Sequence, residues 1–313
     1  MESKAMSVLY PLKFVPIFKQ MIWGSETWGL SGVKGSESVV SNGDLRGKMI
    51  SEIIREYREQ LVGGKNYHRF GDEFPLLIKF IDASLDLSVQ VHPNDELARM
   101  RHGKRGKSEM WYVTGARPGA RLHAGFSCSL SPDEYERKVA DGTIADALAE
   151  YEVGEGDVFY LPAGRVHSLG AGTSVAEIQE TSDVTYRIFD FNRLGLDGKP
   201  RELHTALAKD AIDFTVLRDY RTHYQLSKNE ETLLVRCPHF TTVLYDIDEC
   251  VSKDISSLDS FLAVMCTEGE GTVSDSQGNR AGVRAGETVL LPACSGIVTF
   301  APSHQMKLLA SYV

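Results

Sequence analysis

The sequence predicts an all-β dominated protein built as two jelly-roll β-barrels, with a small helical insertion in the first barrel. Three observations support this prediction. Strand-like segments recur along the chain, one eight-residue segment occurs twice, and metal-binding residue types accompany only the first copy of that segment. Short strands separated by turn residues, without long helical patterns, are typical of antiparallel barrels.

The predicted strands are rich in β-branched and aromatic residues and are separated by Gly, Pro, Asn or Asp. They are residues 76–82, 87–92, 109–115, 157–163, 241–248, 261–269 and 287–293. Two segments are predicted to be helical. Ser131 and Glu134 form a capping box with Pro132 in the first turn, which starts a helix that reaches about Leu148. Residues 202–212 form the second.

The repeated segment reads GDVFYLPA at residues 156–163 and GETVLLPA at residues 286–293. Each copy follows a strand that ends in Gly, which is the pattern of a jelly-roll barrel, although such a pattern can also arise twice by chance. The first copy continues to His167, whereas the matching position in the second is Ile297. We therefore predict a metal-binding, catalytic domain at residues 1–195, with the helical insertion around 131–150. Residues 196–313 are predicted to form a second barrel without metal.

Composition excludes several classes of protein. Among 313 residues the net charge is −9 and no basic stretch is present, which argues against a nucleic-acid partner. The five cysteines are scattered without a C-x-x-C pair, so neither a disulfide framework nor a thiolate zinc site is expected. The N-terminal residues lack the apolar core of a signal peptide, and no apolar run is long enough to cross a membrane. We expect a cytoplasmic protein.

Alternation along residues 87–92 points to a binding site. In a strand, alternate side chains face the same side, so Leu87, Val89 and Val91 would share one face. The opposite face would carry Ser88, Gln90 and His92. Three polar groups on one face indicate either solvent exposure or a site.

Two further segments supply ligand types. Lys107 and Glu109 share a face of a strongly apolar strand, and His167 follows the Leu-Pro-Ala turn. Gln90, His92, Glu109 and His167 together offer two imidazoles and two oxygen donors, which suits one Zn²⁺ per chain, with Mn²⁺, Co²⁺ or Fe²⁺ as possible substitutes. The other histidines are interpreted as structural or surface residues: His68, His102, His123, His204, His223, His239 and His304.

These segments resemble the type I mannose-6-phosphate isomerases (phosphomannose isomerases) of the short bacterial form, which belong to the cupin superfamily. The resemblance rests on residues 18–24, on Q-x-H-P-N-D and G-K-S-E-x-W-Y, and on G-[DE]-x-x-x-L-P-A-G-x-x-H, and covers roughly the first 200 residues. It implies two cupin barrels and the four metal ligands named above. It further implies catalytic roles for Lys107, Glu177, Asp183 and Arg187, and substrate binding by Ser88, Lys79 and Arg193.

The resemblance implies interconversion of mannose 6-phosphate and fructose 6-phosphate through a cis-enediol. Arg187 would stabilise negative charge or assist proton movement between the oxygens. Two bases are candidates, Lys107 and Glu177. A nearby cation would lower the pKa of Lys107 and so favour its neutral amine. Longer family members carry a His before the active-site Lys, and here that position is Gly106, so this residue cannot act as the base.

Two alternatives remain. One is a non-catalytic sugar-phosphate-binding cupin, which only a turnover assay separates from an isomerase. The other is a metal-dependent cupin oxygenase, against which the neutral amide of Gln90 argues. The expected partner is a small sugar phosphate, with no nucleic acid and no membrane, and the chain is expected to be a monomer or a weak homo-oligomer.

Overall fold

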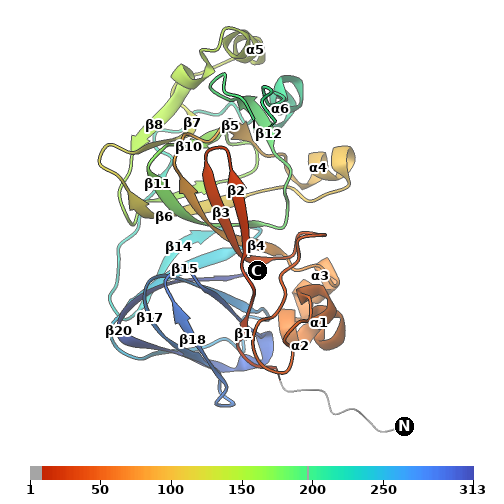
Figure 1. The fold of residues 1–313 in the computed structure, drawn as a ribbon, viewed down its shortest axis with the longest axis vertical. Helices are drawn as coiled ribbons and strands as arrows, with labels where there is room; N and C mark the ends of the chain where they lie inside the picture. Colours follow the sequence, from red (N-terminus) through yellow and green to blue (C-terminus); the bar gives the residue numbers. More distant parts are fainter. Residues whose placement is uncertain (1–8, 196) are drawn as a thin grey trace. The chain divides into compact units, whose positions relative to one another are not determined.

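The computed structural model describes residues 9–195 and 197–313. The described chain forms two compact units, which we call the first and second unit. The first unit contains residues 9–17, 29–76 and 224–313, and the second contains residues 18–28 and 77–223. Strands arranged in three antiparallel sheets dominate both (Figure 1), which confirms the β-dominated prediction.

Part of the predicted domain 1–195 packs with the C-terminal strands rather than with the metal-binding segments. Residues 9–17 and 29–76 lie in the unit of the C-terminal strands, because β1 pairs with β19 through Leu12 and Leu290. The compact units therefore do not divide at residue 195.

The first unit contains an eight-stranded sheet. Its strands are β1 (Leu12–Lys13), β14 (Glu231–Arg236), β15 (Thr241–Ile247), β16 (Val251–Asp254), β17 (Leu262–Ser274), β18 (Arg280–Arg284), β19 (Thr288–Leu291) and β20 (Ile297–Tyr312). Three helices and one 3₁₀ turn accompany it: α1 (Ile50–Tyr57), α2 (Glu59–Val62), α3 (Gly64–Phe70) and η2 (Ala293–Ser295). The strands enclose a cluster of buried aliphatic and aromatic side chains, including Val264 and Phe300.

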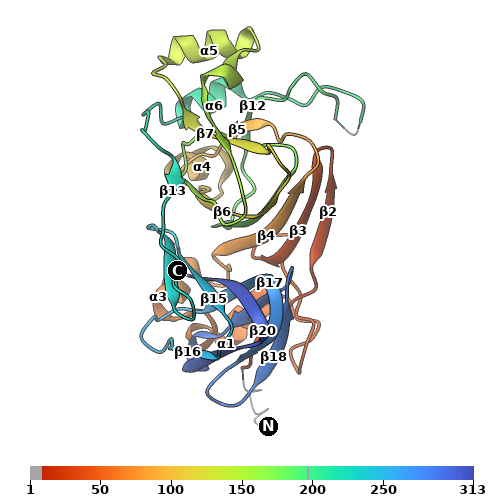
Figure 2. The same cartoon turned by 90° about the vertical axis from the view of Figure 1, so that its left-hand side faces the viewer.

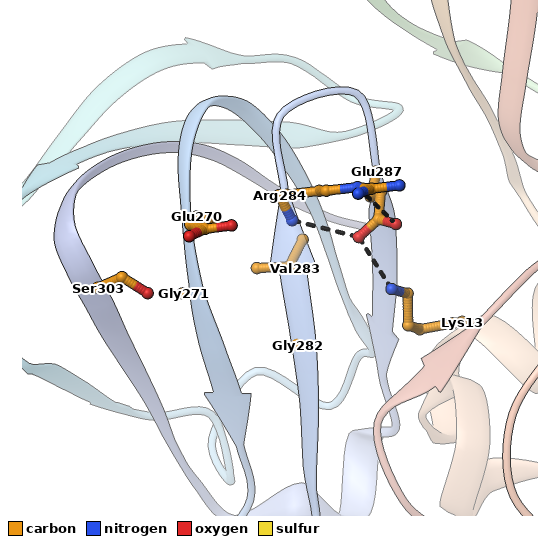
Figure 3. Close-up of a pocket in the computed structure, with 8 residues that line it drawn as sticks. All are labelled: Lys13, Glu270, Gly271, Gly282, Val283, Arg284, Glu287 and Ser303. Carbon is orange, nitrogen blue, oxygen red and sulfur yellow. Dashed lines mark hydrogen bonds and ion pairs between the residues drawn. The ribbon is translucent and has the colours of Figure 1, made fainter.

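A surface pocket of about 450 Å³ lies on this sheet (Figure 3). Three of its four charged residues form ion pairs with one another. Glu287 accepts from Lys13 Nζ at 2.8 Å and lies 3.5 Å from Arg284 Nε. These contacts connect β1 to the β18–β19 hairpin. The ion pairs therefore have a structural role in holding the pocket walls together.

The second unit contains two sheets. The seven-stranded sheet has the order β13 (Arg221–Thr222), β9 (Val158–Leu161), β6 (Glu109–Ala116), β11 (Thr173–Glu180), β4 (Leu76–Ala83), β3 (Gly24–Ser31) and β2 (Ile17–Met21). The five-stranded sheet has the order β12 (Tyr186–Phe189), β5 (Val89–Val91), β10 (His167–Leu169), β7 (Arg121–Phe126) and β8 (Leu148–Glu152).

The two sheets of the second unit pack face to face (Figure 2), because both contribute to one hydrophobic cluster. Trp111 and Val175 enter it from the seven-stranded sheet, and Leu122 and Leu169 enter it from the five-stranded sheet. The outer face of the five-stranded sheet, with Val89 and Val91, belongs to a second cluster. Gln90, which lies between them on β5, therefore faces the inner side.

Helices cover that outer face. They are α4 (Asp95–His102), α5 (Pro132–Ala140) and α6 (Thr205–Ala211), together with the 3₁₀ turn η1 (Ile144–Ala147). The capping box of α5 is confirmed, since Ser131 N–H donates to Glu134 Oε2 at 2.8 Å. The helix ends at Ala140 rather than near Leu148, because Gly142 adopts a positive φ of 73° and the chain turns into η1. The second predicted helix is confirmed as α6.

The repeated segment adopts the same pairing in both units. Gly156 donates to Val113 O, and Val113 in turn donates to Asp157 O, both at 2.9 Å. In the other copy Gly286 donates to Cys266 O and Cys266 donates to Glu287 O, again at 2.9 Å. Within the part of the chain that the structure describes, no helix is long and apolar enough to span a membrane.

Candidate metal centre

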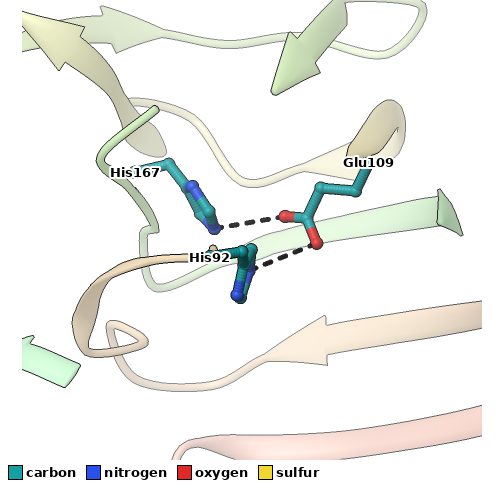
Figure 4. A group of neighbouring side chains, drawn as sticks. All are labelled: His92, Glu109 and His167. Carbon is teal, nitrogen blue, oxygen red and sulfur yellow. Dashed lines mark ion pairs between the residues drawn. The ribbon is translucent and has the colours of Figure 1, made fainter. Parts of the chain in front are cut away.

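Three buried donors converge between the two sheets of the second unit. His92 follows β5, Glu109 begins β6 and His167 begins β10, and their ligand atoms lie within 4.8 Å of one another (Figure 4). Each carboxylate oxygen of Glu109 faces one imidazole. Oε2 lies 3.4 Å from His92 Nε2, and Oε1 lies 3.1 Å from His167 Nε2. The structure thus brings together three of the four predicted ligands as one group.

Backbone hydrogen bonds fix the segments that carry these donors. His167 is the strand partner of Gln90, and Glu109 is the partner of Leu161. The turn between them is tied to the first segment, because Gly164 N–H donates to His92 O at 2.9 Å. Strand pairing and this turn hydrogen bond therefore fix the backbone positions of the donors.

The tautomer of each histidine follows from its second ring nitrogen. His92 Nδ1 lies 2.9 Å from Val184 O, and His167 Nδ1 lies 2.9 Å from Arg165 O. A carbonyl oxygen only accepts, so each Nδ1 carries a proton, and in the neutral ring each Nε2 presents a lone pair. This is the arrangement of histidines that bind metal ions.

The donor set fits a divalent cation. His167 Nε2 and Glu109 Oε1 are both acceptors, and Oε1 is buried without a hydrogen-bond partner among the described residues. Two facing lone pairs repel each other unless a positive charge lies near both. Two imidazoles and a carboxylate suit a first-row divalent ion.

Gln90 lies at the edge of this group. Its Nε2 is 3.3 Å from His167 Nε2, and the side chain is half-buried. Rotation of the amide by half a turn would exchange nitrogen and oxygen, so the carbonyl oxygen can occupy the same position. A fourth oxygen donor is therefore within reach of the three buried ligands.

Lys107 supplies the positive charge nearest the donors. Its Nζ is 3.0 Å from His92 Nε2, bonds Glu109 Oε2 and lies 3.8 Å from Glu177 Oε1. Burial alone would raise the pKa of Glu109, but the Lys107 charge holds it well below the ordinary value. Burial and the Lys107 charge lower the pKa of His92 to about 3, so its imidazole is neutral.

Charged side chains continue across the seven-stranded sheet. From β6 outward, neighbouring strands carry Glu109, Glu177, Lys79 and Glu26. Lys79 Nζ lies 3.0 Å from Glu177 Oε1 and 3.5 Å from Glu26 Oε2. Burial alone would lower the pKa of Lys79, but the carboxylates of Glu177 and Glu26 raise it instead, so Lys79 is an ammonium.

Sequence reasoning missed two parts of this row. Glu26 is buried on β3 and accepts from Trp28 Nε1 at 2.6 Å, and Trp111 Nε1 donates to Glu177 Oε2 at 2.8 Å. A Glu-x-Trp alternation beside the 18–24 segment is the signal that marks Glu26. No local signal marks the contact between Trp111 and Glu177.

Arg187 lies on the five-stranded sheet that carries Gln90 and His167, and Ser88 directly precedes β5 of that sheet. Arg187 on β12 is the strand partner of Gln90, and its Nη1 donates to Glu202 O at 2.9 Å. Burial, and then the Arg201 charge, lower the pKa of this guanidinium. Ser88 is buried directly before β5. Leu87 was expected on the face of Val89, but it packs in the inner cluster because it precedes the regular strand.

Two predicted residues are engaged elsewhere. Asp183 forms an exposed ion pair with Lys104 at 2.6 Å. Arg193 Nη2 donates to Asp190 Oδ1 at 2.9 Å, and Arg201 binds the same carboxylate. The structure therefore does not bring Asp183 or Arg193 into direct contact with the donor group.

The surroundings of residue 106 explain why this position is a glycine. A Cβ built on Gly106 would lie 2.5 Å from Asp95 N and 2.6 Å from Asn94 C. Its own N–H donates to Asp95 Oδ1 at 2.8 Å. Any side chain here would collide with backbone, so a histidine cannot occupy this position without moving the segment.

Comparison with known proteins identifies relatives over most of the chain. Residues 13–152 match the family model described as phosphomannose isomerase type I, catalytic domain. The mannose-6-phosphate isomerase ManA of Bacillus subtilis is 34% identical over 280 residues, covering 83% of this chain and 86% of that protein. The mannose-6-phosphate isomerase of Streptococcus mutans is 33% identical over 268 residues, covering 85% and 82%. The crystal structure of mannose 6-phosphate isomerase from Bacillus subtilis superposes with a TM-score of 0.86, at 29% identity, over 97% of this chain and all of that one.

Proposed function

This chain belongs to the type I phosphomannose isomerase family, and on that premise we propose that it is a zinc-dependent aldose-ketose isomerase. Mannose 6-phosphate and fructose 6-phosphate are its substrates in this proposal, interconverted through a cis-enediol. The convergence of His92 Nε2, His167 Nε2 and the Glu109 carboxylate within 4.8 Å is the observation that carries the zinc assignment. Gln90 completes the proposed ligand set.

The reaction moves one proton between neighbouring carbons, so it needs a base and a way to stabilise negative charge on oxygen. A divalent ion held by these four residues would supply Lewis-acid stabilisation of that charge. Arg187 would contribute a fixed positive charge from the neighbouring strand. Lys107 and Glu177 are the two proposed bases, and 3.8 Å separates Nζ from Oε1, so either can exchange a proton with the other through a short path.

Substrate binding is proposed for Lys79, Ser88 and Arg193. Lys79 is supported by its charge, since the carboxylates of Glu177 and Glu26 on either side keep it as an ammonium. Asp183 is proposed to act indirectly, because its carboxylate pairs with Lys104 at the surface. These roles predict that Lys79→Met raises KM for the sugar phosphate more than it lowers kcat.

We further propose that both copies of the repeat belong to cupin jelly-roll barrels, with the metal in the first. Support comes from the matched hydrogen bonds at Gly156 and Gly286. Strand pairing also gives the second copy Leu262 opposite Leu291, at the position where Glu109 lies opposite Leu161. The counterparts of Glu109 and His167 are thus Leu262 and Ile297, which cannot bind a metal.

A coupled isomerase assay tests the proposal. The wild-type protein should interconvert the two sugar phosphates, lose activity with a chelator and regain it with Zn²⁺. His167→Ala should be inactive and should not respond to Zn²⁺. Full activity of metal-free protein, or binding of the sugar phosphate without turnover, would contradict the proposal, and oxygen uptake with Fe²⁺ would favour an oxygenase.

A further inference from the structure

His204 forms a reciprocal pair of hydrogen bonds with Arg187. The Arg187 backbone N–H donates to His204 Nδ1 at 3.0 Å, and the His204 backbone N–H donates to Arg187 O at 2.7 Å. Arg187 lies on β12, which is the last strand of its sheet. An edge strand presents backbone groups without a neighbour, and here one histidine satisfies both groups of one residue.

This contact defines the state of the imidazole. A backbone N–H only donates, so Nδ1 must be the unprotonated nitrogen and the ring must be neutral. Burial, and then the Arg187 charge, lower the pKa of His204, which agrees with this geometry. The titratable groups that face the ring are Arg187 on β12, Glu202 in its own segment, His102 on α4 and Tyr186 on β12.

The segment that ends at His204 is held at both ends. Arg201 donates to the buried carboxylate of Asp190 through Nε at 2.7 Å, just beyond the end of β12. Between these anchors Glu202 O accepts from Arg187 Nη1 at 2.9 Å. His204 then starts α6, since its own carbonyl accepts from Ala208 N–H at 2.8 Å. The start of a helix and an edge strand thus meet at this residue.

One donor of the Arg187 guanidinium has no partner among the described residues. Within the described chain, Arg187 Nε is buried and has no hydrogen-bond partner. Fixing the backbone and Nη1 while leaving Nε available orients a cation toward an anionic partner. This is the requirement for stabilising charge during a reaction without reorganisation.

We propose that His204 is a positioning residue for Arg187, acting through its neutral Nδ1. The inference rests on the proposed function, in which Arg187 stabilises the charge that develops on the sugar. His204 does not touch the reacting atoms in this proposal. It sets the backbone position from which the Arg187 side chain extends, and small displacements of such a group reduce turnover strongly.

Two substitutions distinguish the effect of the hydrogen-bond acceptor from the effect of the ring's volume. His204→Asn places Oδ1 near the position of Nδ1 and should keep most of the wild-type kcat. His204→Leu fills the space without an acceptor and should lower kcat about tenfold or more while KM changes less. His223→Leu, at an exposed histidine of the same unit, is the matched control and should leave both constants unchanged.

A double-mutant cycle tests whether the effect passes through Arg187. In an Arg187→Ala background, His204→Leu should cause no further loss, because the group that it positions is gone. Equal losses in both backgrounds, or wild-type kcat in His204→Leu, would overturn the inference. Equal kcat values for His204→Asn and His204→Leu would also overturn it.

A second measurement does not depend on turnover. Hydrogen exchange of the Arg187 amide should be faster in His204→Leu than in wild type, and close to wild type in His204→Asn. Unchanged exchange in His204→Leu would contradict the contact itself. An inactive wild-type protein would instead refute the proposed isomerase, and the exchange result would still decide whether His204 holds Arg187.

Discussion

Trp111 on β6 donates its indole N–H to Glu177 on the neighbouring strand β11, with 2.8 Å between Nε1 and Oε2. The other carboxylate oxygen of Glu177 lies 3.0 Å from Lys79 Nζ. One side chain of the hydrophobic core therefore fixes the orientation of a candidate base.

Trp111→Phe tests this orientation. The phenyl ring stays in the core but is smaller than the indole, and a buried carboxylate oxygen loses its donor, which typically costs about 1–3 kcal/mol of unfolding free energy. We expect lower kcat with little change in KM, measured by steady-state kinetics and urea denaturation. Trp28→Phe is the matched control, because it removes the equivalent bond to Glu26 rather than to Glu177. Equal kcat in wild type and Trp111→Phe would exclude an orienting role.

Removal of metal should lower the stability of the protein. Without a cation the lone pairs of His167 Nε2 and Glu109 Oε1, 3.1 Å apart, repel each other. At a free Zn²⁺ concentration about 1,000 times Kd, binding adds about 4 kcal/mol. Chelation should therefore lower Tm, and Zn²⁺ should restore it. His167→Ala should show no such recovery, and a wild-type Tm insensitive to both treatments would argue against a metal at this site.

Gly106→Ala should destabilise the protein. The added methyl group would lie against the Asn94–Asp95 backbone, and overpacking of this kind costs about 1–3 kcal/mol. The shift should also move Lys107 and reduce kcat. Gly154→Ala is the control, since nothing lies within 4 Å of its Cβ position. Similar denaturation midpoints for the two variants would show that the contact at Gly106 is not rigid.

The neutral form of His204 predicts a dependence of stability on pH. Its pKa in the folded protein lies below the ordinary value of 6.5, mainly because of burial. As pH falls through 6.5, the unfolded chain takes up the proton first, so stability is lost down to the folded pKa and is fully present above 6.5. His204→Asn lacks this group. Urea denaturation from pH 8 to pH 5 should therefore reduce the wild-type free energy of unfolding relative to that of the variant. Parallel curves would contradict the prediction.

Alternation of side chains made much of the donor group predictable. Residues in β5 face inward or outward by their position, and Val89 and Val91 do pack on the outer side while Gln90 approaches His167. The rule fails at Leu87, where the regular strand has not yet begun. Sequence alone predicts a face, and only tertiary structure decides where the strand starts.

Helix α4 was not predicted, although its cap is local. Asn94 accepts from Leu97 N–H at 2.9 Å, and Gly103 ends the helix with a positive φ of 62°. The helix is only eight residues long, and its buried face contributes Ala98 alone, so hydrophobic periodicity gives almost no signal.

Two contacts that the sequence did not predict join residues that are distant along the chain. Glu26 and Lys79 are 53 residues apart, and Arg187 and His204 are 17 residues apart. Neither pair lies within one element, so no local pattern marks it. His204 was interpreted as structural or surface because a single histidine carries no information about its partner.

The paired hydrogen bonds of the repeat bear on how the protein matures. The same backbone frame forms around Gly286 and Cys266, where the facing positions are Leu262 and Ile297 rather than metal ligands. This backbone arrangement forms in the second copy with apolar residues at those positions, so its folding does not require a metal ion. The chain should therefore fold first and acquire its metal afterwards, so that cellular metal supply would limit the active fraction of the protein rather than its yield.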